Sequence, residues 1–157
     1  MTSEPRPDFP ERVEKRIDID AAPSRVWRAL TEPRQAETWM SDEPLQLTTD
    51  WSVGGPIAMS GVLHGRLRFR NTGVVEAFEP ERVLQYTHWN SLSRRLLPDR
   101  PENHVVIRFE LQPAANGTSL HLILRNLADY AVYGHINYYW EIALAALKRH
   151  CETAPTD

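Results

Sequence analysis

The sequence predicts an α+β protein in which a curved antiparallel sheet of about six or seven strands wraps around one long C-terminal helix. Two observations support this fold class. Between residues 44 and 126, short segments of alternating polarity are joined by hairpin-length connections, as in an antiparallel sheet. Residues 130–152 carry one apolar stripe at helical spacing, and such a helix must bury that stripe against another element.

The N-terminal part predicts one strand followed by two short helices. Residues 12–20 alternate between apolar and polar side chains, as expected of a half-buried strand. Pro23 fits the first turn of a helix, where its missing N–H costs nothing. Pro33 ends that helix and starts a second one over 33–40. Because few of their residues are apolar, we expect both helices to close one end of the space between the sheet and the long helix.

The central strands are predicted from alternation and from turn residues. His64 and Gly65 suit the two-residue turn of a hairpin. Segments with this pattern lie at 44–49, 57–63, 66–72, 73–78, 83–89, 104–113 and 118–127, and we expect about six strands from them.

The strand over 83–89 carries aromatic residues, so its two faces matter. Gln85 and Thr87 are assigned to the outer face, which turns Tyr86 and His88 toward the core. Trp89 then lies on the outside and would need cover, from the 90–103 loop or from a second subunit.

The last element is the longest, and its stripe defines the face that meets the sheet. The stripe contains Tyr133, Ile136, Asn137, Trp140, Ala143, Leu144, Leu147 and Cys151. Lys148, Arg149 and His150 suit the negative end of the helix dipole.

Composition indicates one domain with a sizeable core, because 41% of the 157 residues are hydrophobic. We expect this domain over 12–152, a flexible segment over 1–11 and a tail over 153–157. A formal net charge of −3 argues against nucleic acid and anionic membranes as partners. No apolar run reaches the roughly 20 residues that span a bilayer, and the N-terminus has no secretion-signal pattern, so we expect a cytoplasmic protein.

Metal and nucleophile motifs are missing from the sequence. No two of the six histidines stand at i and i+4 on the long helix, and only a cross-strand approach of His88 and His104 remains open. Cys151, the one cysteine, excludes an internal disulfide and fits a small buried hydrophobe. We therefore expect no metal, no cofactor and no catalytic set.

Several segments, in this order, resemble one known family over roughly residues 13–151. They are "IDIDAAPSRVWRALTEPRQAETWM", "VGGPI", "HGRLRFRNTGVVEAFEPERVLQYTHW", "LPDRPENHVVIRFELQPAANGTSLHL" and "HINYYWEIALAALKRH". The chain is similar in these segments to the activator-of-heat-shock-protein-ATPase homologue group of the START / birch-pollen-allergen-like (SRPBCC) superfamily.

The resemblance implies a helix-grip fold, in which the curved sheet grips the C-terminal helix. It also implies a cavity between sheet and helix, where most of the superfamily binds apolar or amphipathic small molecules. Some relatives are polyketide cyclases or dehydratases. The eukaryotic namesake, a larger protein with a second domain, stimulates a chaperone ATPase. The fold therefore leaves three functions open.

We expect binding of an apolar, amphipathic or aromatic small molecule without catalysis. One alternative is a cyclase or dehydratase that uses a pocket histidine, tyrosine and asparagine; another is a protein that interacts with a chaperone ATPase. A homodimer is a further open alternative.

The candidate pocket residues come from the first half of the long helix and from the strands that face it. Asn137 is the most distinctive of them, because an amide buried on an apolar stripe must find a hydrogen-bond partner. The candidates are Trp39, Met59, Phe69, Tyr86, His88, Ile107, Tyr133, Ile136, Asn137 and Trp140.

Overall fold

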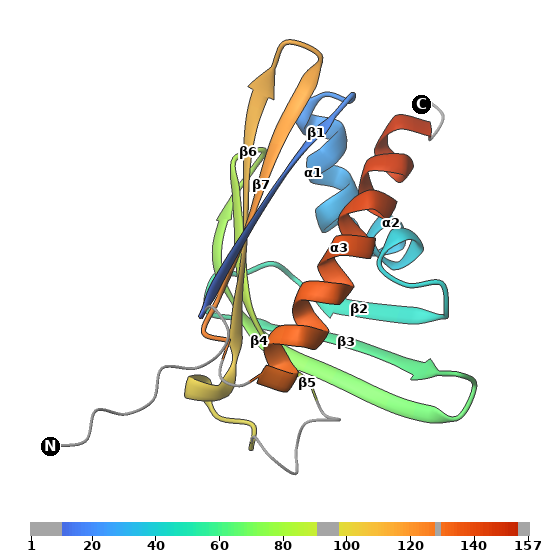
Figure 1. Cartoon of the computed structure of the whole chain (residues 1–157), viewed down its shortest axis with the longest axis vertical. Coiled ribbons are helices and arrows are strands. Elements are labelled where there is room, and N and C mark those ends of the chain that lie inside the picture. Colours follow the sequence, from blue (N-terminus) through green and yellow to red (C-terminus); the bar gives the residue numbers. More distant parts are fainter. Residues whose placement is uncertain (1–10, 91–97, 128–129, 154–157) are drawn as a thin grey trace, which may run out of the picture.

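The computed structural model describes residues 11–90, 98–127 and 130–153 of the chain (Figure 1). The segment 1–10, residues 91–97 of the 90–103 loop, residues 128–129 and the residues after 153 lie outside this part, and so do most of the predicted flexible segment and tail. The N-terminal elements are β1 (Arg12–Ile19), α1 (Pro23–Thr31) and α2 (Pro33–Trp39). The next strands are β2 (Leu45–Thr49), β3 (Pro56–Leu63), β4 (Leu67–Glu79) and β5 (Val83–Asn90). A short 3₁₀ turn (Pro101–Asn103), β6 (Val105–Ala114), β7 (Gly117–Arg125) and α3 (Tyr130–Thr153) complete the chain.

All seven strands form one antiparallel sheet in the order β1-β7-β6-β5-β4-β3-β2. Strands that follow one another in the sequence are adjacent in the sheet, except β1 and β2. These two lie at opposite edges, because α1 and α2 carry the chain from one edge to the other. The sheet curves around α3, which runs along its concave side (Figure 1). This confirms the α+β helix-grip architecture, with seven strands and two short helices after the first.

Strand β4 joins two of the predicted segments. The segments 66–72 and 73–78 form one strand of 13 residues. Gly73 lies inside it, because a Cβ at that position would come within 1.8 Å of the carbonyl oxygen of Thr87 on β5. The glycine marks a close approach of two strands and not a turn, which is a recognised use of glycine inside a strand.

The hairpin turn between β3 and β4 is confirmed. His64 and Gly65 have φ angles of 54° and 68°, and the Arg66 N–H donates to the Leu63 carbonyl at 3.0 Å. Two consecutive positive φ angles are what the turns that match the twist of a hairpin require.

The core lies between the concave face of the sheet and one face of α3. Leu120, Leu122 and Leu124 of β7 are fully buried, and Leu147 of α3 is fully buried opposite the sheet. The predicted stripe of α3 is therefore the buried face in its second half, where Ala143, Leu144 and Cys151 also lie inside.

Helices α1 and α2 close the end of the core that faces the second half of α3. The Trp39 indole N–H donates to the Ala29 carbonyl at 2.8 Å and joins the two helices. The Arg25 guanidinium donates to the carbonyls of His150 and Cys151 at 3.3 and 3.4 Å, which ties α1 to the end of α3. The expected role of the two short helices is thus what the structure shows.

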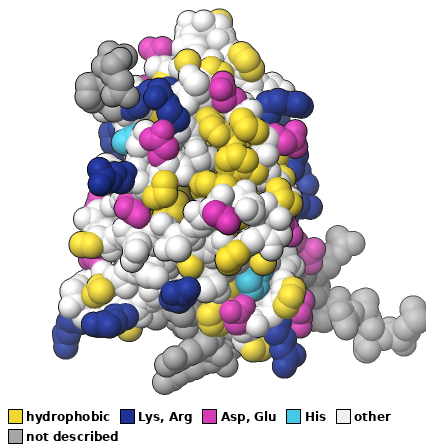
Figure 2. Space-filling view, turned by 180° about the vertical axis from the view of Figure 1, so that it is seen from behind, with side chains coloured by type: hydrophobic (Ala, Val, Ile, Leu, Met, Phe, Trp, Pro, Cys, Tyr) yellow, Lys and Arg dark blue, Asp and Glu magenta, His cyan; other side chains and the backbone are white. Residues whose placement is uncertain are grey.

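The surface carries charges of both signs. On the face shown in Figure 2, acidic and basic side chains are interspersed and no large field of one sign forms. Among the described helices, none is long and apolar enough to cross a bilayer.

Candidate ligand-binding site

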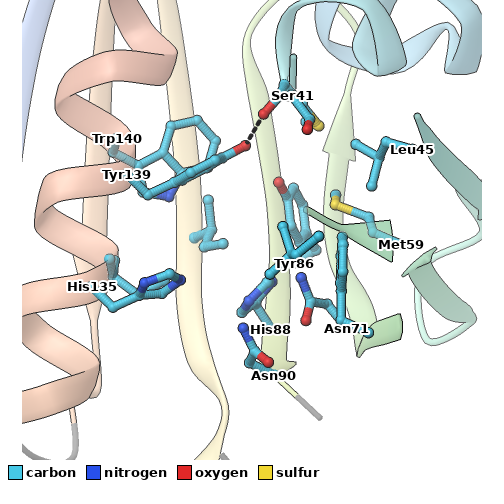
Figure 3. Close-up of a pocket in the computed structure, with 15 residues that line it drawn as sticks. Ser41, Leu45, Met59, Asn71, Tyr86, His88, Asn90, His135, Tyr139 and Trp140 are labelled. Carbon is cyan, nitrogen blue, oxygen red and sulfur yellow. Dashed lines mark hydrogen bonds between the residues drawn. The ribbon is translucent and has the colours of Figure 1, made fainter. Parts of the chain in front are cut away.

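A cavity of about 160 Å³ lies between the first half of α3 and the strands β3, β4 and β5 (Figure 3). Its lining is mostly apolar and contains Met40, Ser41, Leu45, Met59, Leu63, Phe69, Asn71, Tyr86, His88, Asn90, Ile107, His135, Ile136, Tyr139 and Trp140. The helix supplies its side of the lining at positions 135, 136, 139 and 140, which lie on one face at i, i+1, i+4 and i+5. The second half of α3 packs on the sheet and on α1, so the hollow is confined to the first half.

Four polar side chains of the lining gather at one end. Asn71 on β4 and His88 and Asn90 on β5 lie together on the sheet, and His135 faces them from α3 (Figure 3). Leu45 and Met59 lie at the other side of the same space, beside β2 and β3. The cavity therefore has an apolar body and a polar end, which is the usual design of a small-molecule site.

Three buried polar atoms of the lining have no hydrogen-bond partner within the described part of the chain. They are Oδ1 of Asn71, the hydroxyl of Tyr86 and Nε1 of Trp140. Tyr86 and Trp140 are each only 2% exposed, so solvent does not replace the missing partners. Buried polar groups are paired in the great majority of native proteins, and each exception needs an explanation.

Tyr139 provides a contrast in the same lining. Its hydroxyl donates to the Met40 carbonyl at 2.9 Å, so this half-buried tyrosine is satisfied and ties α3 to the end of α2. Burial raises the pKa of both Tyr86 and Tyr139, and both hydroxyls stay protonated at neutral pH.

His88 is neutral at physiological pH. Burial of the ring is the main reason that its pKa falls to about 4, and the nearby His135 and His104 lower it further. A neutral imidazole offers one donor and one acceptor nitrogen to whatever lies at the polar end.

Seven of the ten predicted pocket residues line the cavity: Met59, Phe69, Tyr86, His88, Ile107, Ile136 and Trp140. Leu84, Tyr86 and His88 indeed share the inner face of β5, and Trp89 is half-buried and not exposed. The binding role of these residues stays a prediction.

The other three predicted residues do not line the cavity. Trp39 is buried one layer away, with its ring 6.3 Å from that of Trp140. Tyr133 and Asn137 are half-buried on α3. The argument from Asn137 assumed that its amide is fully buried, and this was wrong. A half-buried amide can reach solvent, so an unmade hydrogen bond within the protein costs little there.

Sequence reasoning missed eight lining residues: Met40, Ser41, Leu45, Leu63, Asn71, Asn90, His135 and Tyr139. Asn71 could have been predicted, because it stands two positions after Phe69 on β4 and therefore lies on the same inner face. His135 and Tyr139 stand four residues apart, one position before Ile136 and Trp140, so a wider stripe would have included them.

A second polar cluster lies outside the cavity and has a structural role. The His104 ring pairs with the Asp99 carboxylate at 2.7 Å and with the Thr87 hydroxyl at 3.0 Å. The same hydroxyl accepts the Val74 N–H at 2.9 Å, so the cluster ties β4, β5 and the segment before β6 together. His104 is thus occupied away from His88, and the described residues hold no group of three metal-ligating side chains.

Comparison with known proteins agrees with this architecture. A protein from Chromobacterium violaceum superimposes with a TM-score of 0.77 at 19% identity, over 92% of this chain and 100% of that chain. A protein from Cytophaga hutchinsonii gives 0.72 at 26% identity, over 88% and 91%. The Aha1 dimer from Colwellia psychrerythraea gives 0.70 at 21% identity, over 92% and 98%.

A search of curated proteins finds no match to the sequence. The family model of the "Activator of Hsp90 ATPase homolog 1-like protein" matches residues 20–152, which span the elements from α1 to all but the last residue of α3. The chain therefore belongs to the family of activator of Hsp90 ATPase homolog 1-like proteins.

Proposed function

We propose that this protein binds an apolar or amphipathic small molecule in the cavity between α3 and the sheet. The observation that carries the proposal is the pairing of an apolar lining with buried polar atoms that no group of the described residues satisfies. A buried polar group without a partner costs about 1–3 kcal/mol. A ligand that supplies the partners would recover this free energy together with the burial of its own apolar surface.

The lining favours binding over proton transfer. A general base works best with a pKa near the working pH, whereas the pKa of His88 is lowered to about 4. The pKa of the Tyr86 hydroxyl is raised by burial, so it is a hydrogen-bond donor and a poor proton source. A cyclase or dehydratase that moves a proton through these two groups is therefore the weaker hypothesis.

Native mass spectrometry of freshly purified protein tests the proposal first, because it detects a molecule that has been retained through purification. A thermal-shift screen of small aromatic and aliphatic compounds follows. A ligand present at 100 times its Kd adds about 2.7 kcal/mol of stability, which this method resolves easily. No retained mass and no shift with any compound would contradict the proposal.

We also propose that the protein forms a homodimer. The related Colwellia psychrerythraea protein was solved as a dimer. Ile142 on α3 is 53% exposed, and a second subunit that packs on α3 would cover it. Light scattering should give twice the monomer mass, and Ile142→Glu should restore the monomer mass; a monomeric wild type would contradict this.

A further inference from the structure

The unpartnered atoms of the cavity restrict the chemistry of the ligand, and this step rests on the proposed binding function. The indole N–H of Trp140 can only donate, so its partner must be an acceptor. The Tyr86 hydroxyl stays protonated and is a second donor from the opposite wall. Asn71 Oδ1 is an acceptor at the polar end, where a ligand hydroxyl or N–H would satisfy it.

Charge restricts the ligand further. Among the described residues, no aspartate, glutamate, lysine or arginine lines the cavity. His88 stays neutral because burial disfavours its charged form. An ionised ligand group would lose its hydration without gaining a counter-charge from an aspartate, glutamate, lysine or arginine, which costs far more than a neutral polar group does.

Size sets the third limit. An apolar cavity of about 150 Å³ holds one benzene molecule, and the cavity here measures about 160 Å³. Sites for drug-sized ligands are roughly 300–1,000 Å³. The buried part of the ligand is therefore about one ring, and the aromatic walls supplied by Phe69, Tyr86 and Trp140 suit a flat one.

We propose that the ligand is an uncharged single-ring compound that carries a carbonyl acceptor and a hydroxyl or N–H donor. Tyr86 and Trp140 donate hydrogen bonds to the acceptor side of the molecule, and Asn71 accepts one from its donor side. Phenolic ketones and aromatic amides of this size have the required groups.

Four probes of similar shape separate the contributions of the ligand's carbonyl, hydroxyl and charge to the affinity. 4-Hydroxyacetophenone carries both polar groups, 4-ethylphenol lacks the carbonyl, ethylbenzene lacks both, and 4-hydroxybenzoate replaces the ketone with a carboxylate. Titration calorimetry at pH 7 should find the highest affinity for 4-hydroxyacetophenone, a lower one for 4-ethylphenol and a still lower one for ethylbenzene. 4-Hydroxybenzoate should bind most weakly. Loss of the carbonyl should lower the affinity about a hundredfold, since two hydrogen bonds to buried donors are at stake and each is worth about tenfold.

Tyr86→Phe removes one donor and leaves the ring in place. It should lower the affinity for 4-hydroxyacetophenone about tenfold and leave that for ethylbenzene unchanged. Tyr138→Phe is the matched control, because Tyr138 is 70% exposed on α3 and does not line the cavity; it should change neither affinity.

The outcomes distinguish this inference from the proposed function. If ethylbenzene binds as tightly as 4-hydroxyacetophenone and Tyr86→Phe affects neither, apolar binding stands and the recognition of a carbonyl is overturned. If 4-hydroxybenzoate binds best, the requirement for an uncharged ligand is wrong. If none of the four binds, the inference falls, and the broader compound screen decides whether the binding function falls with it.

Discussion

Two tyrosines of the same lining, the buried Tyr86 and the half-buried Tyr139, differ in the hydrogen bonding of their hydroxyls. The Tyr139 hydroxyl donates to the Met40 carbonyl, whereas the Tyr86 hydroxyl has no partner within the described residues. Replacing Tyr139 with Phe should lower the free energy of unfolding by about 1 kcal/mol, because a carbonyl loses its hydrogen bond.

Tyr86→Phe should leave the ligand-free protein as stable as the wild type or about 0.5–1 kcal/mol more stable, because it removes a buried group that gains nothing in the folded state. Urea denaturation of both variants without ligand measures the difference. A clear destabilisation by Tyr86→Phe would mean that the hydroxyl is already satisfied and would remove the main argument for the polar part of the site.

His88 links the cavity to pH. The ordinary pKa of a histidine is near 6.5, and burial lowers the pKa of His88 to about 4 in the folded chain. Between these values the unfolded chain binds the proton more readily, so falling pH favours unfolding. The contribution of the neutral His88 ring to the free energy of unfolding is therefore complete above pH 6.5 and is lost by about pH 4. It is worth up to about 3 kcal/mol, at about 1.4 kcal/mol per pKa unit.

His88→Gln should therefore reduce the loss of stability between pH 7 and pH 4. Denaturant titrations at several pH values check this, and the comparison with wild type cancels the other groups, such as His150, whose pKa is also lowered by burial. A stability difference between wild type and variant that does not change with pH would show that the ring is well solvated.

Residue patterns predicted some of the residues that line the cavity and missed others. Asn137 and Asn71 show why. Asn137 was chosen because it interrupts an apolar stripe, but a helix stripe has margins, and the Asn137 side chain is only half-buried. Asn71 follows arginines in the chain and looks like part of a solvated strand, yet alternation turns it inward beside Phe69. Orientation toward a cavity depends on the neighbouring element as well as on the local pattern.

At the scale of elements, local sequence was sufficient. Each strand and helix was predicted within two residues of its observed bounds, except where β4 was divided at Gly73. Alternation and turn residues act over a few positions, so a single chain reveals them. The place where α3 separates from the sheet depends on how the whole sheet curves, and no short segment encodes that.

Glycines in β4 and α3 give a prediction about these elements. A Cβ at Gly73 would collide with the Thr87 carbonyl oxygen, whereas a Cβ at Gly134 meets nothing within 4 Å. Gly73→Ala should cost about 3 kcal/mol, because backbone must move. Gly134→Ala should add roughly 0.5–1 kcal/mol, because it removes a flexible residue from a helix interior.

Thermal unfolding followed by circular dichroism compares the two alanine variants directly. If Gly73→Ala is tolerated like Gly134→Ala, β4 and β5 are not held as closely as the structure has them, and the division of β4 into two strands would again be open.

At the scale of the molecule, the two halves of α3 are held differently. The second half is tied by Arg25 of α1 and by Lys148, which donates to the Asp18 carbonyl at 2.6 Å. Leu147 is fully buried there. The first half lines the cavity with His135 and Tyr139 (Figure 3), and Trp140 both lines the cavity and packs on Phe109 of β6, with ring centroids 5.5 Å apart. Local opening is easiest where buried contacts are fewest.

A ligand that bridges Trp140 and Tyr86 would supply the missing contacts, and this predicts a polarised response to binding. Amide hydrogen exchange should slow in the first half of α3, over residues 132–140, and in β5 when 4-hydroxyacetophenone is added. It should change little over residues 143–151, because that half is already packed. The variant Tyr86→Phe at the same ligand concentration should show a weaker effect, since less ligand is bound. Equal slowing along the whole helix, or slowing confined to its second half, would contradict a ligand site between the first half of α3 and the sheet.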